Sequence, residues 1–185
     1  MFGVYISGPI LPYLPSLKPP KKRARYCITV LSILIYAATL PAYFRLPANY
    51  RHQATAALLF SYPGTLTRYL LSINLNPRIK LFPLGTFTAN ALGTALLGLF
   101  HVLEGMPSVS SNACSLLQGL GDGYCGCLTT VSTFAAEVDA LDGRKASFYV
   151  IMSWVVGQLL LLVIMGSSYW GGHVSEQMRC SFQGS

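Results

Sequence analysis

The chain has 185 residues, of which 52% are hydrophobic and only 10% are charged. In soluble domains about a quarter of the residues are charged. The much lower share here excludes an ordinary water-soluble domain and indicates a protein embedded in the lipid bilayer. The net charge of +7 does not indicate nucleic-acid binding, because the basic residues flank apolar segments and do not form a face.

Five segments are long and apolar enough to be read as spans, since a helix needs about 20 residues to cross a bilayer. They are Tyr26–Phe44, Gln53–Ser72, Phe82–Leu103, Ala113–Ala136 and Ser147–Trp170. Aromatic residues lie near several of their ends, as in interfacial belts. We therefore expect an irregular basic tail over residues 1–25, a first transmembrane helix over 26–45, a four-helix unit over 53–172 and a polar tail over 173–185.

The distribution of Lys and Arg predicts the orientation of these spans, because cytoplasmic loops are enriched in both. One side carries Arg45, Arg51 and Arg179. The other side carries nine, namely Lys18, Lys21, Lys22, Arg23, Arg25, Arg78, Lys80, Arg144 and Lys145. We expect the N-terminus in the cytoplasm and the C-terminus outside.

The third span, FPLGTFTANALGTALLGLF, carries two stripes with a period of four residues. Small residues form the first stripe, where another helix can approach closely: Gly85, Ala89 and Gly93. Polar residues form the second stripe: Thr86, Asn90 and Thr94. Such residues either hydrogen-bond to a neighbouring helix or face a watery path, and Asn90 is the first candidate for a path.

The fourth span contains GYCGCLTTVSTFAAE, in which Gly126 and the following threonines are poor helix formers. We expect the helix to unwind around residues 126–129, near the middle of the membrane. Carbonyl groups freed there must be satisfied by protein, water or an ion, so they could hold a cation. The hydroxyls of Ser132 and Thr133 could donate to a passing solute. Cys125 and Cys127 lack the second ligand pair of a metal site, which favours close packing as their role.

In the fifth span, Tyr149, Ser153 and Gly157 share one helix face. This spacing by itself is equally typical of packing beside an interfacial tyrosine.

Taken together, four pieces of the chain resemble the CrcB/Fluc fluoride channels, and most closely the second repeat of the tandem fungal fluoride exporters. The pieces are PGTLTRYLLS (63–72), FPLGTFTANALGTALLG (82–98), GDGYCGCLTTVSTFAAE (121–137) and the spaced Tyr149, Ser153 and Gly157. The resemblance implies an all-α membrane protein: a four-helix CrcB-type repeat with a broken third repeat helix, preceded by one extra linker transmembrane helix. It also implies a passive channel that exports fluoride across a fungal plasma membrane, and not an enzyme.

The resemblance further implies roles for single residues. The ion pathway would be lined by Thr86, Asn90, Ser132, Thr133, Phe134, Tyr149 and Ser153. Glu137 would lie at the pore mouth, although an ordinary rim carboxylate beside Asp139 and Asp142 is an equal alternative. The backbone carbonyls of Gly126 and Thr129 would bind a structural sodium ion. Val131 departs from the family pattern, which has the first of two phenylalanines at this position.

Channels of this family pair two inverted repeats, which implies an inverted homologous repeat as the partner of this chain. The cluster from Lys21 to Arg25 fixes one orientation, so copies of the chain cannot form an inverted homodimer. We therefore expect one half of a channel, either a truncated gene product or a chain that needs a complementary repeat. Two alternatives stay open: a small transporter that binds another solute at Asn90, and a non-conducting repeat that supports a working partner.

Overall fold

A computed structural model describes residues 21–45, 56–79, 82–106 and 109–172. Its described residues form helices and connecting turns without any strand, which confirms the all-helical prediction. Residues 1–20 of the expected tail over 1–25, the expected tail over 173–185 and the start of the second span at 53–55 lie outside the described residues. The expectation that the tail is irregular up to residue 25 is wrong, because residues 22–25 are helical. The chain divides into two compact units, residues 1–38 and 39–185, which are considered separately.

The helix α2 (Lys22–Arg45) contains the whole of the first predicted span. None of its residues is buried, and apolar side chains such as Ile33 and Leu34 are about 60% exposed (Ile33 60%, Leu34 61%). A helix that is apolar on all sides and uncovered by protein suits a lipid environment.

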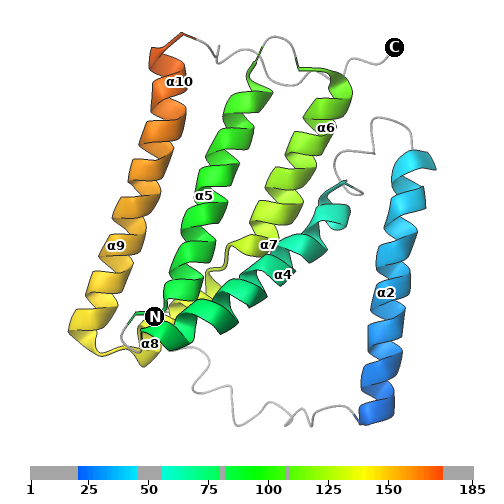
Figure 1. Cartoon of the computed structure of the whole chain (residues 1–185), viewed down its shortest axis with the longest axis horizontal. Helices are drawn as coiled ribbons and strands as arrows, with labels where there is room; N and C mark the ends of the chain where they lie inside the picture. Colours follow the sequence, from blue (N-terminus) through cyan, green and yellow to red (C-terminus); the bar gives the residue numbers. More distant parts are fainter. Residues whose placement is uncertain (1–20, 46–55, 80–81, 107–108, 173–185) are drawn as a thin grey trace, which may run out of the picture. The chain divides into compact units, whose positions relative to one another are not determined.

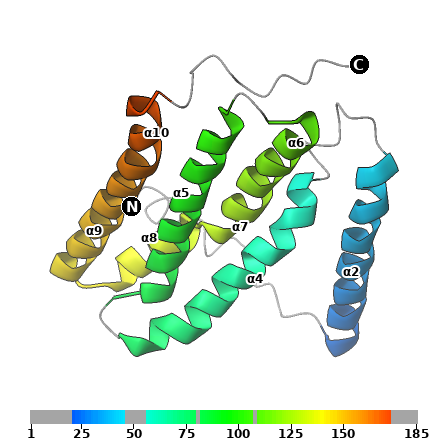
Figure 2. The ribbon, with the colours of Figure 1, turned by 45° about the horizontal axis from the view of Figure 1, so that its top comes forward.

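The second unit begins with α4 (Ala57–Leu75), the turn η3 (Asn76–Arg78) and α5 (Leu84–Glu104). A broken helical stretch follows: α6 (Ser111–Gly119), the π-helical η4 (Leu120–Cys125), α7 (Gly126–Leu128) and α8 (Ser132–Ala140). The unit ends with α9 (Gly143–Leu161), η5 (Leu162–Gly166) and α10 (Ser167–Trp170). Helix α5 is central, because it contacts α4, α9 and the stretch from α6 to α7 (Figures 1 and 2).

Glycines allow the helices of this unit to pack backbone against backbone. A Cβ atom at Gly123 would overlap the carbonyl group of Ala57, and one at Gly64 would overlap the carbonyl oxygen of Tyr124. Helix α4 therefore lies directly against η4, and the phenol of Tyr124 donates a hydrogen bond to Thr67 Oγ1 at 3.2 Å. The small stripe predicted on α5 is confirmed as a packing surface, since Gly85, Ala89 and Gly93 are all buried.

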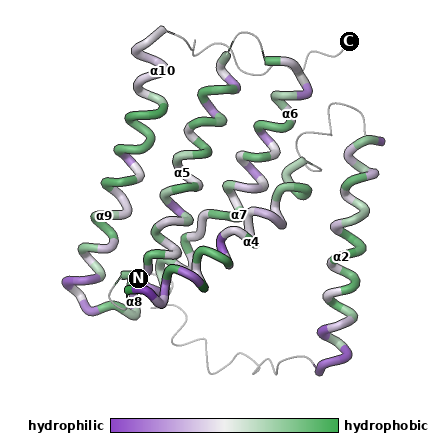
Figure 3. Tube along the Cα trace, viewed as in Figure 1, coloured by the Kyte–Doolittle hydropathy of each residue, from purple (hydrophilic) through white to green (hydrophobic). Residues whose placement is uncertain are grey.

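Within the part of the chain that the structure describes, three helices are long and apolar enough to cross a membrane: Lys22–Arg45, Leu84–Glu104 and Gly143–Trp170. The chain is thus a multi-pass membrane protein. The other two predicted spans do not reach this standard in the structure, because α4 carries polar side chains and Pro63 and because the fourth span is interrupted. Apolar residues predominate along the middle of the long helices, whereas the start of α2 and of α9 is hydrophilic (Figure 3), and Trp154 and Trp170 are 66% and 80% exposed.

The contact between α4 and η4 predicts that the same substitution, Gly to Ala, changes the stability differently at two positions. Ala is favoured over Gly by about 1 kcal/mol in a helix, so Gly157→Ala, where a Cβ meets open space, should leave the chain as stable or slightly more stable. Gly123→Ala should destabilise it by about 2 kcal/mol, because the added methyl group is forced against the Ala57 backbone. Thermal unfolding of both variants in detergent, followed by size-exclusion chromatography, tests this, and equal stability of the two would contradict the close packing.

Candidate functional site

The fourth predicted span is broken, as expected, but the break lies three residues further along the chain. Gly126 keeps helical dihedral angles (φ −61°, ψ −35°) and α7 runs to Leu128, so the expected unwinding over residues 126–129 is wrong for residues 126–128 and holds for Thr129. The helix ends at Leu128, Thr129 is extended (φ −74°, ψ 155°), and α8 begins at Ser132. The break thus coincides with two consecutive β-branched threonines and not with the glycine, which is helical because nothing forces it out.

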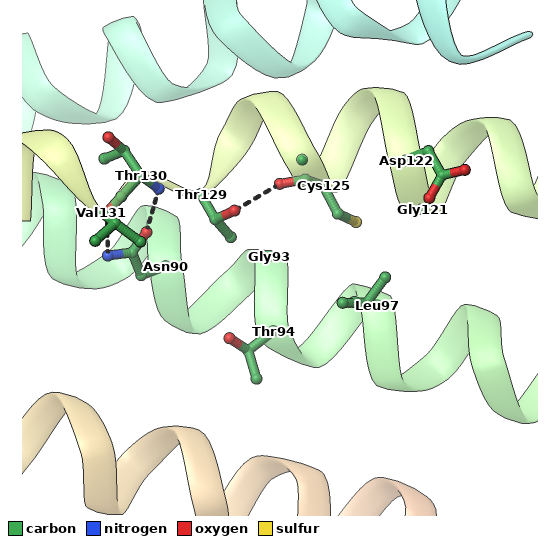
Figure 4. Close-up of a pocket in the computed structure, with 11 residues that line it drawn as sticks. Asn90, Gly93, Thr94, Leu97, Gly121, Asp122, Cys125, Thr129, Thr130 and Val131 are labelled. Atoms are coloured by element: carbon green, nitrogen blue, oxygen red, sulfur yellow. Dashed lines mark hydrogen bonds between the residues drawn. The ribbon is translucent and has the colours of Figure 1, made fainter. Parts of the chain in front are cut away.

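The side chain of Asn90 holds the break in place. Its Oδ1 accepts a hydrogen bond from the backbone N–H of Thr130 at 2.8 Å, and its Nδ2 donates to the Thr130 carbonyl at 3.1 Å (Figure 4). One amide therefore satisfies both backbone groups of a residue that has left the helix. Sequence reasoning singled out Asn90 as a residue facing a path; the structure shows in addition that it positions the backbone opposite it.

This pairing leaves carbonyl groups of the last helical turn without partners. In a continuous α-helix the N–H of Thr130 would bond to the carbonyl of Gly126, but here it bonds to Asn90. In the described part of the chain, no hydrogen bond ends on the carbonyl oxygens of residues 126–129. The N–H and the hydroxyl of Thr129 both donate instead to the Cys125 carbonyl, at 2.9 and 3.0 Å.

Thr130 is a residue that sequence reasoning missed. Its side chain is 8% exposed, and its hydroxyl lies 3.3 Å from Thr133 Oγ1, to which it donates, and 3.4 Å from Ser132 Oγ. The same hydroxyl accepts from the backbone N–H of Thr133 in the first turn of α8 at 3.4 Å. The TTVST run could have indicated it, since a threonine hydroxyl close to the start of a helix commonly accepts from the first free N–H groups, although here Val131 separates Thr130 from α8.

A cavity of about 520 Å³ opens beside the break. Figure 4 shows Asn90 and Val131 at one end of this cavity and Asp122 at the other. Between them the lining includes Thr94, Gly126 and Thr129. Asn90 and Thr94 of the polar stripe on α5 thus line the same cavity as Gly126 and Thr129, the two residues whose carbonyl groups were predicted to bind a cation. Asp122 was not predicted to lie there.

A second group of predicted residues gathers around Glu137 on α8. Thr86 Oγ1 donates to Glu137 Oε1 at 2.7 Å, and the Tyr149 hydroxyl donates to Glu137 Oε2 at 3.0 Å. Thr86 and Tyr149 are almost completely buried, at 1% and 0% exposure. Glu137 is therefore bonded through both oxygens, unlike its exposed neighbours Asp139 and Asp142.

Aromatic rings enclose this group. The ring of Tyr149 lies 4.8 Å from that of Phe134 and 5.0 Å from that of Phe82, measured between centroids. One turn further along α9, Ser153 has a buried Oγ atom without a hydrogen-bond partner among the described residues. The predicted pathway residues thus fall into two neighbouring groups, one around Thr130 and one around Glu137, and Ser153 provides an unused hydroxyl close to the second.

Comparison with known proteins gives this arrangement a context. Residues 55–167 match the family described as CrcB-like protein, Camphor Resistance (CrcB). The chain belongs to this family. It is 35% identical over 120 residues to a fluoride-specific ion channel FluC of Bacteroides fragilis, a match that covers 63% of this chain and 90% of that relative.

Fungal members of the CrcB family are also similar to the chain. Fluoride export protein 1 of Neurospora crassa is 48% identical over 123 residues, which cover 66% of this chain and 23% of that protein. Fluoride export protein 1 of Saccharomyces cerevisiae is 34% identical over 148 residues, which cover 75% of this chain and 39% of that protein. The chain therefore spans less than half of the length of these fungal relatives.

The two hydrogen bonds of Asn90 predict that the Thr130 amide is protected from solvent although it lies outside any helix. Asn90→Ala should raise its hydrogen-exchange rate about tenfold, because an intramolecular hydrogen bond contributes about 1 kcal/mol or slightly more. Thr94→Ala, one turn along the same stripe, is the matched control and should leave the rate unchanged. Hydrogen exchange measured by mass spectrometry on a peptide covering residues 126–134 tests this. Unaltered exchange in Asn90→Ala would show that the two hydrogen bonds of Asn90 do not hold the break in place.

Proposed function

We propose that this chain is one half of a passive, fluoride-selective channel that carries fluoride out of the cytoplasm and relieves its toxicity. The observation that carries the proposal is the broken helix held by Asn90 beside a cavity, in a chain of the CrcB-like family. The relatives bear names that state fluoride export and fluoride-specific conduction. Such a protein moves an ion down its gradient and is not an enzyme.

The chemistry of the described groups suits a small, strongly hydrated anion. Fluoride must exchange water for N–H and O–H donors and for the positive edges of aromatic rings. Free donors are available: the second N–H of Asn90, the hydroxyl proton of Thr133, which is only an acceptor from Thr130, and the unpartnered hydroxyl of Ser153. None carries a fixed positive charge, so the anion is bound weakly enough to leave.

The hydroxyls near Glu137 need a different role from the one that the resemblance implies. Thr86 and Tyr149 each give their single proton to the carboxylate, so neither has a proton left for an anion in this arrangement. We propose that they hold Glu137 at the mouth of the pathway, and that the edge of Phe134 faces the ion beside Ser132 and Thr133. An anion would reach the Thr86 and Tyr149 protons when Glu137 turns away.

Transport of this kind requires no energy source beyond the membrane potential. A negative cytoplasm drives an anion outward with about 2.3 kcal/mol per charge per 100 mV. The direction of export then follows from the voltage.

The free carbonyls at the break fit a structural sodium ion. Oxygen atoms without a hydrogen-bond partner at membrane depth need a cation, water or protein to satisfy them, and Gly126 and Thr129 both line the cavity at the break. We propose that these two carbonyls bind the ion, which would supply a fixed positive charge at the junction of two repeats. Asn90 would help to form this site, because it accepts the N–H of Thr130 and so prevents that N–H from bonding to the Gly126 carbonyl.

For the chain as a whole, we propose an irregular basic N-terminal tail that gives way to α2 at Lys22, a linker transmembrane helix over 26–45, a four-helix repeat over 53–172 and a polar tail over 173–185. The N-terminus would face the cytoplasm and the protein would lie in the plasma membrane. The repeat would work against an inverted homologous repeat, supplied by another chain or by further sequence. The cavity at the break, lined by exposed Gly126 and Val131, would be completed by that partner.

One observation favours a second candidate, a non-conducting repeat that supports a working partner. Val131 is 82% exposed at the edge of the cavity, where an aromatic ring is expected from the family pattern. Without that ring, one of the two pathways that meet at the break would lack a group that contacts the anion.

Fluoride efflux from liposomes tests the proposed function. The chain alone should give little flux, and the chain reconstituted with an inverted CrcB-type repeat should give fluoride flux and no chloride flux. In that pair Asn90→Ala should lower the fluoride flux at least tenfold, and Thr94→Ala should leave most of it. Strong flux from the chain alone would overturn the half-channel, and equal passage of chloride would favour a transporter for another solute.

Val131→Phe separates the two candidates. The substituted ring has open space, so stability should stay the same within about 0.5 kcal/mol. If the chain conducts already, flux in the reconstituted pair should change less than twofold. A rise from background to robust flux would instead show that the natural chain is the non-conducting repeat.

A further inference from the structure

Charge is distributed very unevenly along the chain. All six acidic residues lie at position 104 or later, so the first 103 residues carry ten Lys and Arg and no Asp or Glu. Four of these cations fall within Lys21–Arg25, at the start of α2, and all four are exposed. Among the described residues none forms an ion pair with them.

Two of the cations share a helix face with groups that suit a phosphate. Lys22, Arg25, Tyr26 and Thr29 follow one another at spacings of three, one and three residues, which places them within about 100° around the axis of α2. They line a hollow of about 260 Å³. The hydroxyl of Thr29 donates to the Arg25 carbonyl at 2.9 Å, which orients this side chain within the hollow. Lys21 and Arg23 do not line this hollow.

These groups correspond to the chemistry of a phospholipid headgroup. Arg binds phosphate oxygens with two parallel N–H donors, Lys supplies a point charge, and a tyrosine hydroxyl is a neutral donor. Tyr26 is 73% exposed directly before the apolar part of the helix, where tyrosines commonly lie at the level of lipid headgroups. The start of a helix adds partial positive charge at the same end.

We propose that Lys22, Arg25 and Tyr26 form a binding site for the headgroup of an anionic phospholipid of the cytoplasmic leaflet. The site goes beyond fluoride conduction and involves α2 alone. It depends on the proposed orientation only in its choice of leaflet. A cluster that merely sets the orientation of the chain would act through its total charge, whereas a site depends on which face of the helix carries that charge.

Two double variants, each of which loses two positive charges, distinguish a lipid site from an effect of total charge. The full chain, purified in neutral detergent, is titrated with phosphatidylserine and with phosphatidylcholine, and bound lipid is counted by native mass spectrometry. A cation near an anionic membrane surface strengthens binding about fivefold. Lys22→Gln with Arg25→Gln should therefore weaken phosphatidylserine binding about 25-fold, while the control, Lys21→Gln with Arg23→Gln, should weaken it less than fivefold.

A charge-conserving variant and a check of helical content serve as further controls. Swapping the cations, Lys22→Arg with Arg25→Lys, keeps the charge and should retain at least a third of the affinity, and helical content by circular dichroism should be equal in all variants. Equal losses in the two double variants would overturn the site in favour of diffuse charge. The proposal would also fail if phosphatidylcholine bound as well as phosphatidylserine, or if inorganic phosphate displaced the lipid at equal concentration. Fluoride flux does not enter this test, so its failure leaves the channel proposal intact, and the reverse also holds.

Discussion

The pair of hydrogen bonds between Asn90 and the Thr130 backbone is the interaction on which the arrangement of the second unit depends. A chain that leaves its helix at membrane depth exposes an N–H and a carbonyl, and each costs several kcal/mol in hydrocarbon unless it is paired. Asn90 pairs both groups of Thr130 from the neighbouring helix α5. Because the N–H of Thr130 is occupied in this way, the carbonyl of Gly126, a residue that lines the cavity, has no hydrogen-bond partner among the described residues. The same side chain thus stabilises the break and creates its chemistry.

This interaction requires that α5 and the broken stretch lie very close together, and glycine makes that approach possible. A Cβ atom at Gly93, one turn from Asn90, would overlap the methyl group of Thr129. Behind the break, Gly64 and Gly123 let α4 support the other side of the same stretch. The described helices therefore bury little apolar side-chain area between them. Few large apolar side chains among the described residues are fully buried, and Leu128 and Tyr149 are the largest of them. Lipid must supply much of the apolar contact that a soluble protein obtains from its core.

The sequence was sufficient for some of these features and not for others, for physical reasons. Apolar length predicted α2, α5 and the continuous helix from α9 to α10 within a few residues, since a bilayer demands about 20 residues from any span. The four-residue period of Gly85, Ala89 and Gly93 predicted a packing face. The break was misplaced because glycine is only permissive, whereas the tertiary contact from Asn90 decides which residue leaves the helix. The bonds from Thr86 and Tyr149 to Glu137 join residues 51 and 12 positions apart, and no local pattern encodes such a pairing. The roles of these residues toward an ion remain proposals.

The π-helical turn η4 has a consequence for which changes in chain length the protein can accept. A π-helix contains about one more residue per turn than an α-helix, so the wider turn between Leu120 and Cys125 holds a surplus residue without adding rotation. Each later residue therefore faces the direction that the residue before it would face in a continuous α-helix. Deleting one residue within η4 would restore an ordinary helix and leave Thr129 and Thr130 facing α5. Deleting one residue from α6 would instead turn both threonines by about 100°. The LGDGYC stretch is thus the place in this helix that can lose a residue without changing the angular register of the break.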